Sequence, residues 1–158
     1  MKETYPTTVG TLNSSKLKSP LPPLALTALR AIQTVKVYPK GSEFFMEGQS
    51  PQGIYILYAG RVELSIADTQ GRKMILGLAR PGEILGLSAV LSGKYHEETA
   101  AAAIPSQTGF VKCKEFLHFL GDHPEAAFWV VQLLSERVTT TLEQLSCIRR
   151  SPSREIRQ

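Results

Sequence analysis

The sequence predicts a mainly β fold with flanking helices: a jelly roll (double-stranded β-helix), a short N-terminal helix and a long C-terminal dimerisation helix. Two observations lead to this fold class. Between Thr34 and Lys112, short strand-like runs alternate with glycine turns at a spacing of about 8–12 residues, as in sandwiches and jelly rolls. From about Glu125 to Arg149, apolar residues recur at helical spacing.

The strands follow from the positions of the turns. Arg61 to Ile66 alternates polar and apolar residues, and Thr69-Gln70-Gly71 joins this run to Lys73–Leu76 as a hairpin. Gly-containing turns end the other runs in the same way. The predicted strands cover 35–38, 43–46, 53–58, 61–66, 73–76, 98–103 and 108–113.

Helices are predicted on both sides of the strands. Prolines 20, 22 and 23 start a helix near Leu24, and its apolar face is expected to hold Leu24, Ala28, Ala31 and Ile32. A short helix covers 114–120, and Gly121-Asp122-His123-Pro124 ends it and starts the next one. Phe128 and Trp129 add further apolar bulk to the N-terminal half of that long helix.

The long helix carries a near-heptad apolar seam of Val131, Leu134, Val138, Leu142 and Leu145. Such a helix is too long for one small β-domain to cover, so a parallel coiled coil between two identical subunits is the simplest solution. The alternative is a helix folded back over its own sandwich.

Length and composition indicate one domain with appendages. The 158 residues are expected to form a flexible basic arm (1–20), the β-roll (21–123), the dimerisation helix (124–150) and a basic tail (151–158). No apolar run is long enough for a membrane span or a signal peptide, so we expect a cytoplasmic protein without a membrane partner. Cys113 and Cys147 are isolated, which suits unpaired thiols.

The stretch from Arg80 to Ala102 is the most informative part of the chain. Pro81-Gly82 leads to Gly86, a one-turn helix over 87–91, a second glycine turn and a strand-like run ending in Thr99-Ala100. A glycine beside such a short helix leaves backbone N–H groups unpaired and pointing one way, which is how proteins cradle a small anion.

This layout resembles the phosphate-binding cassette of the cyclic-nucleotide-binding domain in Crp/Fnr-family transcriptional regulators. The similarity covers about residues 24–150, including Ala59-Gly60-Arg61-Val62 and the His-Pro-Glu that precedes the long helix. It implies a jelly roll, signal sensing and a homodimer.

Two cassette positions depart from members that bind cyclic AMP. In those members a Glu follows the central Gly and binds the ribose, and an Arg before Ser/Thr-Ala pairs with the phosphate. Here these positions carry Leu87 and Glu98. An acid repels an anionic ligand, so the usual binding of cyclic AMP is disfavoured and no cofactor is assigned. Lys94 or His96 could replace the Arg through a loop shift; the alternative is that both are solvated loop residues.

The resemblance also implies where a ligand pocket lies. Its walls come from the strands, the cassette and the long helix, whose Leu142 is less able than a hydroxyl to bond an adenine amino group. The expected lining is Val62, Leu64, Leu76, Ile84, Leu85, Gly86, Leu87, Ser88, Glu98, Thr99, Ala100, Thr141 and Leu142.

These features predict a non-catalytic ligand-sensing and dimerisation module of a Crp/Fnr-type regulator. DNA binding is expected only through a C-terminal helix-turn-helix domain. Residues 151–158 are too few to form such a domain, and Pro152 breaks the helical run there. The alternative is a stand-alone regulatory protein acting through protein partners. An enzyme is disfavoured because His96, His118 and His123 form no His-x-His pair and no metal set.

Overall fold

The computed structural model describes residues 21–150, and side chains as far as Cys147. The predictions for 1–20 and 151–158 therefore lie outside the described residues. The elements in chain order are α1 (Pro23–Ile32), β1 (Thr34–Tyr38), β2 (Glu43–Phe45), β3 (Gly53–Ala59), β4 (Val62–Ala67), β5 (Lys73–Ala79), β6 (Ile84–Leu85), α2 (Leu87–Ser92), β7 (Thr99–Ala102), β8 (Ser106–Lys112), α3 (Cys113–Asp122) and α4 (Pro124–Arg150).

The strands form two antiparallel sheets with the orders β1-β8-β3-β6 and β2-β7-β4-β5. Strand β1 pairs with β8, β2 with β7, β3 with β6 and β4 with β5. This is the pairing of one long hairpin that has been rolled up, so the predicted jelly roll is confirmed.

Two apolar clusters form the core. The larger one joins the first sheet to the helices, and Leu29, Phe116 and Trp129 are among its fully buried side chains. The smaller one fills the roll between Leu57 of β3 and residues of the second sheet such as Phe44. The cores meet across β3, because Ile56 belongs to the first and Leu57 to the second.

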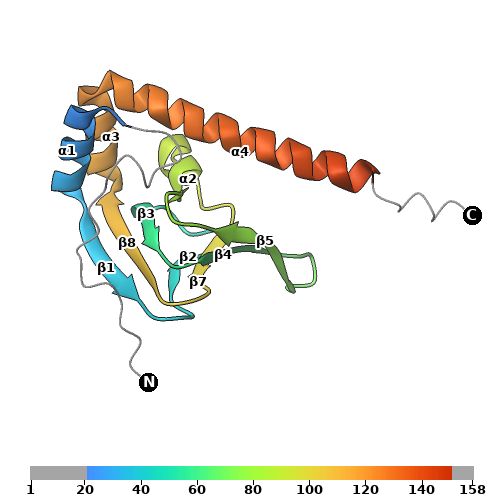
Figure 1. Cartoon of the computed structure of the whole chain (residues 1–158). Coiled ribbons are helices and arrows are strands. Elements are labelled where there is room, and N and C mark those ends of the chain that lie inside the picture. Colours follow the sequence, from blue (N-terminus) through green and yellow to red (C-terminus); the bar gives the residue numbers. More distant parts are fainter. Residues whose placement is uncertain (1–20, 151–158) are drawn as a thin grey trace, which may run out of the picture.

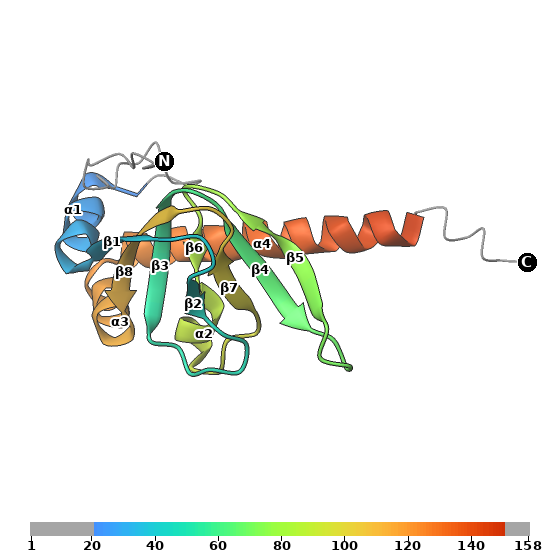
Figure 2. The same ribbon diagram turned by 90° about the horizontal axis from the view of Figure 1, so that it is seen from below.

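The helices lie outside the roll. Helices α1 and α3 gather at one end, and α4 starts there and crosses the roll until its C-terminal half extends over the β4–β5 hairpin (Figures 1 and 2). Only the N-terminal part of α4 is well buried, at Ala126, Trp129 and Val130. Helix α4 therefore overhangs the domain that it belongs to.

The structure corrects the predicted face of α1. Leu24 is 81% exposed and Ala31 is exposed, whereas Ala25 and Leu29 are fully buried against the core. Ala28 and Ile32 pack partly against the core, as predicted. The spacing of apolar residues in this short helix fits more than one face, and packing on α3 selects the face that holds Ala25 and Leu29.

Two details of the later helices also differ from the prediction. Helix α3 continues through Gly121 and ends at Asp122, and the next residue, His123, caps it with a backbone N–H bond to the Phe119 carbonyl oxygen. Of the two aromatic residues expected to thicken α4, Trp129 is buried but Phe128 is 65% exposed.

The hairpin between β4 and β5 is built as the sequence predicts. The Asp68 carboxylate accepts backbone N–H bonds from Gln70 and Arg72, each at 2.8 Å, and Gly71 has φ +80°. Strand β5 is an edge strand whose residues 73–76 and 78 are all exposed.

A side chain added at Gly60 or Gly71 strains the backbone at both positions but collides with neighbouring atoms only at Gly60. Both have positive φ, but a Cβ at Gly60 would lie 2.1 Å from the Ser106 hydroxyl oxygen, whereas a Cβ at Gly71 meets nothing within 4 Å. We expect Gly71→Ala to lower the free energy of unfolding by about 1–2 kcal/mol through backbone strain. Gly60→Ala should cost clearly more, by about 1–3 kcal/mol, through overpacking. Urea unfolding measures both variants, and equal losses of unfolding free energy would contradict the predicted overpacking at Gly60.

Candidate ligand pocket

The cassette has the frame that the sequence predicts. Gly86 (φ +82°) precedes α2 and Gly93 (φ +70°) follows it. A Cβ at Gly86 would approach the His96 ring to 3.2 Å and the Gly53 carbonyl oxygen to 3.3 Å, so both φ and space require glycine. Leu87 is buried and Ser88 is exposed. The frame is therefore held between β3 and the segment that contains His96.

His96 is a buried residue of this frame, so the expectation of a solvated loop residue is wrong. Its ring is 4% exposed and stacks on Phe45, with 3.8 Å between ring centroids and 8° between planes. Its backbone N–H donates to the Gln49 carbonyl oxygen, and its own carbonyl oxygen accepts from Gly48. Burial lowers the pKa of His96, and the nearby Glu98 carboxylate opposes this effect. Lys94, by contrast, is exposed.

Glu98 is paired with an arginine from another part of the chain. The Arg137 Nη2 of α4 donates to Glu98 Oε1 at 2.9 Å, and the side chains are 49% and 14% exposed respectively. At the cassette position where the resemblance places a cation, this chain has an anion, and the cation comes from the helix. The ion pair ties the cassette to α4.

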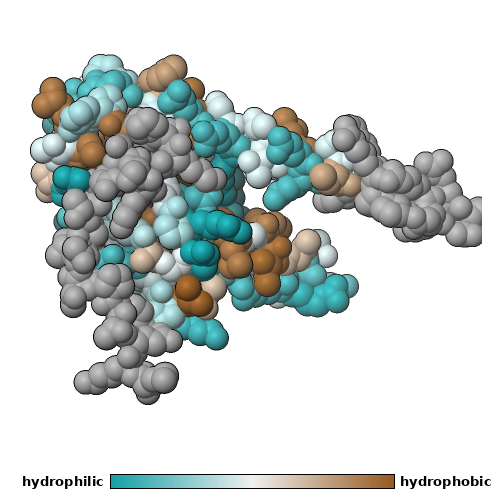
Figure 3. Space-filling view, viewed as in Figure 1, coloured by the Kyte–Doolittle hydropathy of each residue, from teal (hydrophilic) through white to brown (hydrophobic). Residues whose placement is uncertain are grey.

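Two cavities lie beside this pair, between the roll and α4. One holds about 480 Å³ on the side of α2 and His96, and the other holds about 400 Å³ on the side of β5. Apolar side chains gather over the hairpin beneath the overhanging part of α4 (Figure 3). The two cavities share a set of lining residues: Leu87, Glu98, Leu134, Arg137 and Thr141.

Most residues expected to line a pocket lie along one cavity or the other. The first cavity is lined by Gly86, Leu87, Ser88, Glu98, Thr141 and Leu142. The second is lined by Leu64, Leu76, Ile84, Leu85, Leu87, Glu98 and Thr141.

Three expected lining residues lie elsewhere. Val62 and Ala100 are fully buried in the core of the second sheet, because their side chains point into the roll. The Thr99 hydroxyl oxygen accepts the Glu47 backbone N–H at 2.9 Å and lines neither cavity. The resemblance placed Thr99 and Ala100 in the lining, but β7 begins at Thr99 and directs the side chain of Ala100 into the core of the second sheet.

Sequence reasoning missed Arg137, although a signal was present. Arg137 is the single basic residue between Pro124 and Cys147, and it lies one helical turn before Thr141. The Thr141 hydroxyl donates to the Arg137 carbonyl oxygen at 2.9 Å, so both residues face the same side of α4. Leu133, Glu136, Thr140 and Gln144 of α4 also line the second cavity without having been predicted.

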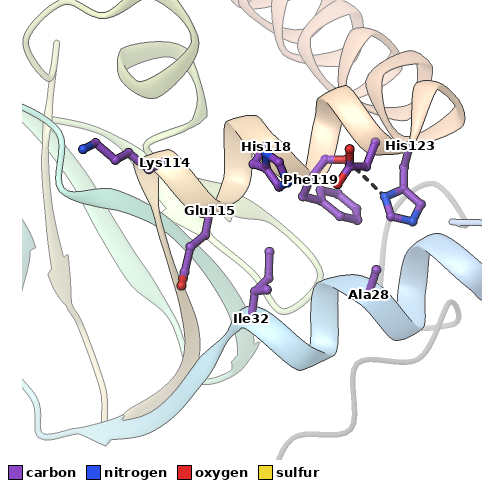
Figure 4. Close-up of a pocket in the computed structure, with 8 residues that line it drawn as sticks. Ala28, Ile32, Lys114, Glu115, His118, Phe119 and His123 are labelled. Carbon is purple, nitrogen blue, oxygen red and sulfur yellow. Dashed lines mark hydrogen bonds and ion pairs between the residues drawn. The ribbon is translucent and has the colours of Figure 1, made fainter.

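A further cavity of about 420 Å³ lies between α1 and α3, away from the cassette (Figure 4). Its apolar side is made by Ile32, Ala28 and Phe119. The His118 Nε2 lies 3.2 Å from Asp122 Oδ2, and His123 Nδ1 lies 3.1 Å from the Phe119 carbonyl oxygen. These partners explain the positions of both rings as helix contacts.

The described residues hold neither a metal cluster nor a membrane-spanning helix. Among residues 21–147, no three His, Cys, Asp or Glu side chains are grouped so that they could hold a metal ion. No helix in the described part of the chain is both long and apolar enough to span a membrane.

The roll, the cassette and the helix together define a cyclic-nucleotide-binding fold, and the comparison with family models agrees. The model for the cyclic nucleotide-binding domain matches residues 35–123, more than half of the chain. The chain therefore belongs to the cyclic nucleotide-binding domain family.

Its relatives include Crp-type transcriptional regulators. The global nitrogen regulator of Synechococcus elongatus is 28% identical over 112 residues, which are 68% of this chain and 49% of that protein. The cyclic AMP receptor protein of Thermus thermophilus is 25% identical over 103 residues, 65% of this chain and 48% of that protein. The chain thus spans about half the length of these curated relatives.

Solved structures agree on the fold. The catabolite activator protein of Thermus thermophilus has a TM-score of 0.72 at 22% identity, covering 82% of this chain and 61% of that one. The sensor domain of the transcriptional regulator DNR from Pseudomonas aeruginosa has a TM-score of 0.63 at 24% identity, covering 78% of this chain and 83% of that one.

The lowered pKa of His96 predicts a loss of stability in acid. Below a pH of about 6.5 the unfolded state binds a proton more readily than the folded state, so the free energy of unfolding falls as the pH drops from about 7.5 to about 5.5. His96→Phe keeps a ring against Phe45 but cannot bind the proton. Its free energy of unfolding should therefore fall less over this pH range than that of the wild type. Urea unfolding of both proteins at the two pH values measures this, and equal losses would refute it.

Proposed function

We propose that the chain is the non-catalytic sensing and dimerisation module of a cytoplasmic Crp/Fnr-type transcriptional regulator. Its signal reaches α4 through the pocket between the roll and that helix. The observation that carries this proposal is the Glu98–Arg137 pair, because it joins the cassette directly to α4. In this proposal, gene control belongs to a part of the regulator beyond the stretch of about half a relative's length that the chain matches.

The same pair argues against cyclic AMP as the ligand. A cyclic phosphate in the cassette would lie close to the Glu98 carboxylate, which is 14% exposed and therefore weakly screened. Arg137 would have to leave Glu98 to reach the phosphate, and the buried carboxylate would then face an anion. A carboxylate that loses its cation and faces an anion at the same time disfavours binding of the phosphate.

The surface of α4 favours a second copy of the chain as its partner. The helix has 27 residues, and at 1.5 Å per residue it is about 40 Å long. Val131, Val138, Leu142 and Leu145 are 56–60% exposed, while Leu134 of the same seam packs partly on the domain's own core. A second copy of α4 would cover these residues as a coiled coil.

Strand β5 extends this apolar surface. Met74, Ile75, Leu76 and Leu78 are 47–61% exposed on an edge strand. An uncovered edge of this kind is a liability for a monomer, and contact with the partner subunit would protect it. The alternative, a regulatory protein that acts through other proteins, would use the same surface.

Titration of cyclic AMP tests the ligand part of the proposal. Isothermal titration calorimetry of the wild-type chain should give no saturable heat at micromolar concentrations of cyclic AMP or cyclic GMP, because Glu98 occupies the anion position. Micromolar binding of either nucleotide would contradict the proposal.

Charging the exposed seam tests the dimer. The double variant Val131→Glu, Leu145→Glu places like charges opposite each other and should convert a dimer into a monomer in light scattering after gel filtration. Neither residue lines the cavities, so the pocket stays intact.

Gln132→Glu is the matched control, since Gln132 is exposed on α4 about 100° away from Val131. It should remain a dimer. A double variant that stays dimeric would overturn the assignment of the seam, and a monomeric wild-type chain would instead favour a different protein as the partner.

A further inference from the structure

The charges around the two cavities are mostly negative. Among the described residues that line them, the acids are Glu83, Glu97, Glu98 and Glu136, and the single Lys or Arg is Arg137. His96 adds no charge near neutral pH, because burial lowers its pKa. An anionic ligand would therefore enter a field of its own sign, whereas a cation would enter a favourable one.

Within this field, Glu98 is the acid that a ligand would meet at the cassette. Its side chain lines both cavities and is 14% exposed. Its ion-pair partner is the guanidinium of Arg137, on the overhanging helix α4, and the Arg137 side chain is 49% exposed. A carboxylate can accept several hydrogen bonds, so a ligand that brings its own N–H donors can replace this contact.

The rest of the lining suits an apolar body. Leu64, Leu76 and Leu85 face the second cavity, and Leu87 and Leu134 face both. Volumes of about 400 and 480 Å³ are in the range of small-molecule sites, which combine apolar walls with a few polar groups that fix the orientation.

We propose that this pocket binds a small amphipathic cation, with an amine, amidine or guanidine head on Glu98 and an apolar body against the leucines. The inference rests on the proposed sensing function and assigns the ligand class of the same pocket. Arg137 then acts as a tethered competitor: in the free protein it occupies Glu98, and the ligand displaces it. Binding would free α4 from the cassette, which turns pocket occupancy into a change at the helix.

Benzamidine is a suitable probe because it joins an amidinium head to a phenyl ring. Benzoate has the same shape with the opposite charge and is its control. Both compounds are titrated by isothermal titration calorimetry. Wild-type protein should bind benzamidine saturably at one site per chain, and it should not bind benzoate.

Variants separate the proposed roles of the two residues. Arg137→Gln removes the competitor, so benzamidine should bind about tenfold more tightly, since a larger fraction of the protein is competent. Arg137→Lys keeps a competing cation, so its affinity should stay close to that of the wild type. Glu98→Gln should lose binding, whereas Glu97→Gln, which removes the same charge one residue away, should weaken it less than about threefold.

Three results would overturn the inference: no saturable binding to wild type and Arg137→Gln, equal binding by Glu98→Gln and wild type, or preferential binding of benzoate. Thermal unfolding of each variant, followed by circular dichroism, verifies that it is folded. If benzamidine does not bind, the proposed dimer and the exclusion of cyclic AMP still stand, because separate experiments test them. Micromolar binding of cyclic AMP would overturn the exclusion of that ligand, and a monomeric wild-type chain would overturn the dimer.

Discussion

The arrangement of cassette and helix depends on one ion pair, between Glu98 and Arg137. Helix α4 is anchored by Ala126, Trp129 and Val130 at its start, and the described residues from Ser135 to Leu145 are all exposed by class. Arg137 is the residue of this second half whose side chain is bonded to the cassette. Core packing fixes the start of α4, and the bond from Arg137 to Glu98 holds the following turns of the helix close to the cassette.

The two partners do not contribute equally. Glu98 is the more buried group, so losing Arg137 would leave a poorly solvated carboxylate, whereas losing Glu98 would leave a guanidinium that water can reach. The cost of desolvating Glu98 therefore offsets much of the attraction between the two charges, so the pair adds little to the free energy of unfolding. Breaking the pair is nevertheless unfavourable unless another cation takes the place of Arg137. A contact with this property suits a switch, because a ligand that supplies a substitute cation removes the penalty for opening it.

Much of the fold could be predicted from local signals, and the site only in part. Glycine turns, alternation and the apolar period of α4 are local, so the roll and the long helix follow from the sequence. The ion pair joins residues that are 39 positions apart, and nothing local to Glu98 indicates its partner. The burial of His96 is also non-local, because Phe45 and Gln49 hold it from a distant segment. Thr99 and Ala100 were misplaced because the resemblance identifies the cassette but not which side chains of β7 enter the core of the second sheet.

The overhang of α4 connects the pocket to the apolar surface. The cavities are bounded on one side by Leu134, Arg137 and Thr141, and the exposed seam continues from this stretch through Val138 and Leu142, which line the first cavity as well. The same turns of one helix thus border the cavities and carry the surface assigned to a second subunit. A rigid helix cannot move at Arg137 without moving its neighbours within the next turn. Any change at the Glu98 contact therefore alters the surface that a second copy would cover.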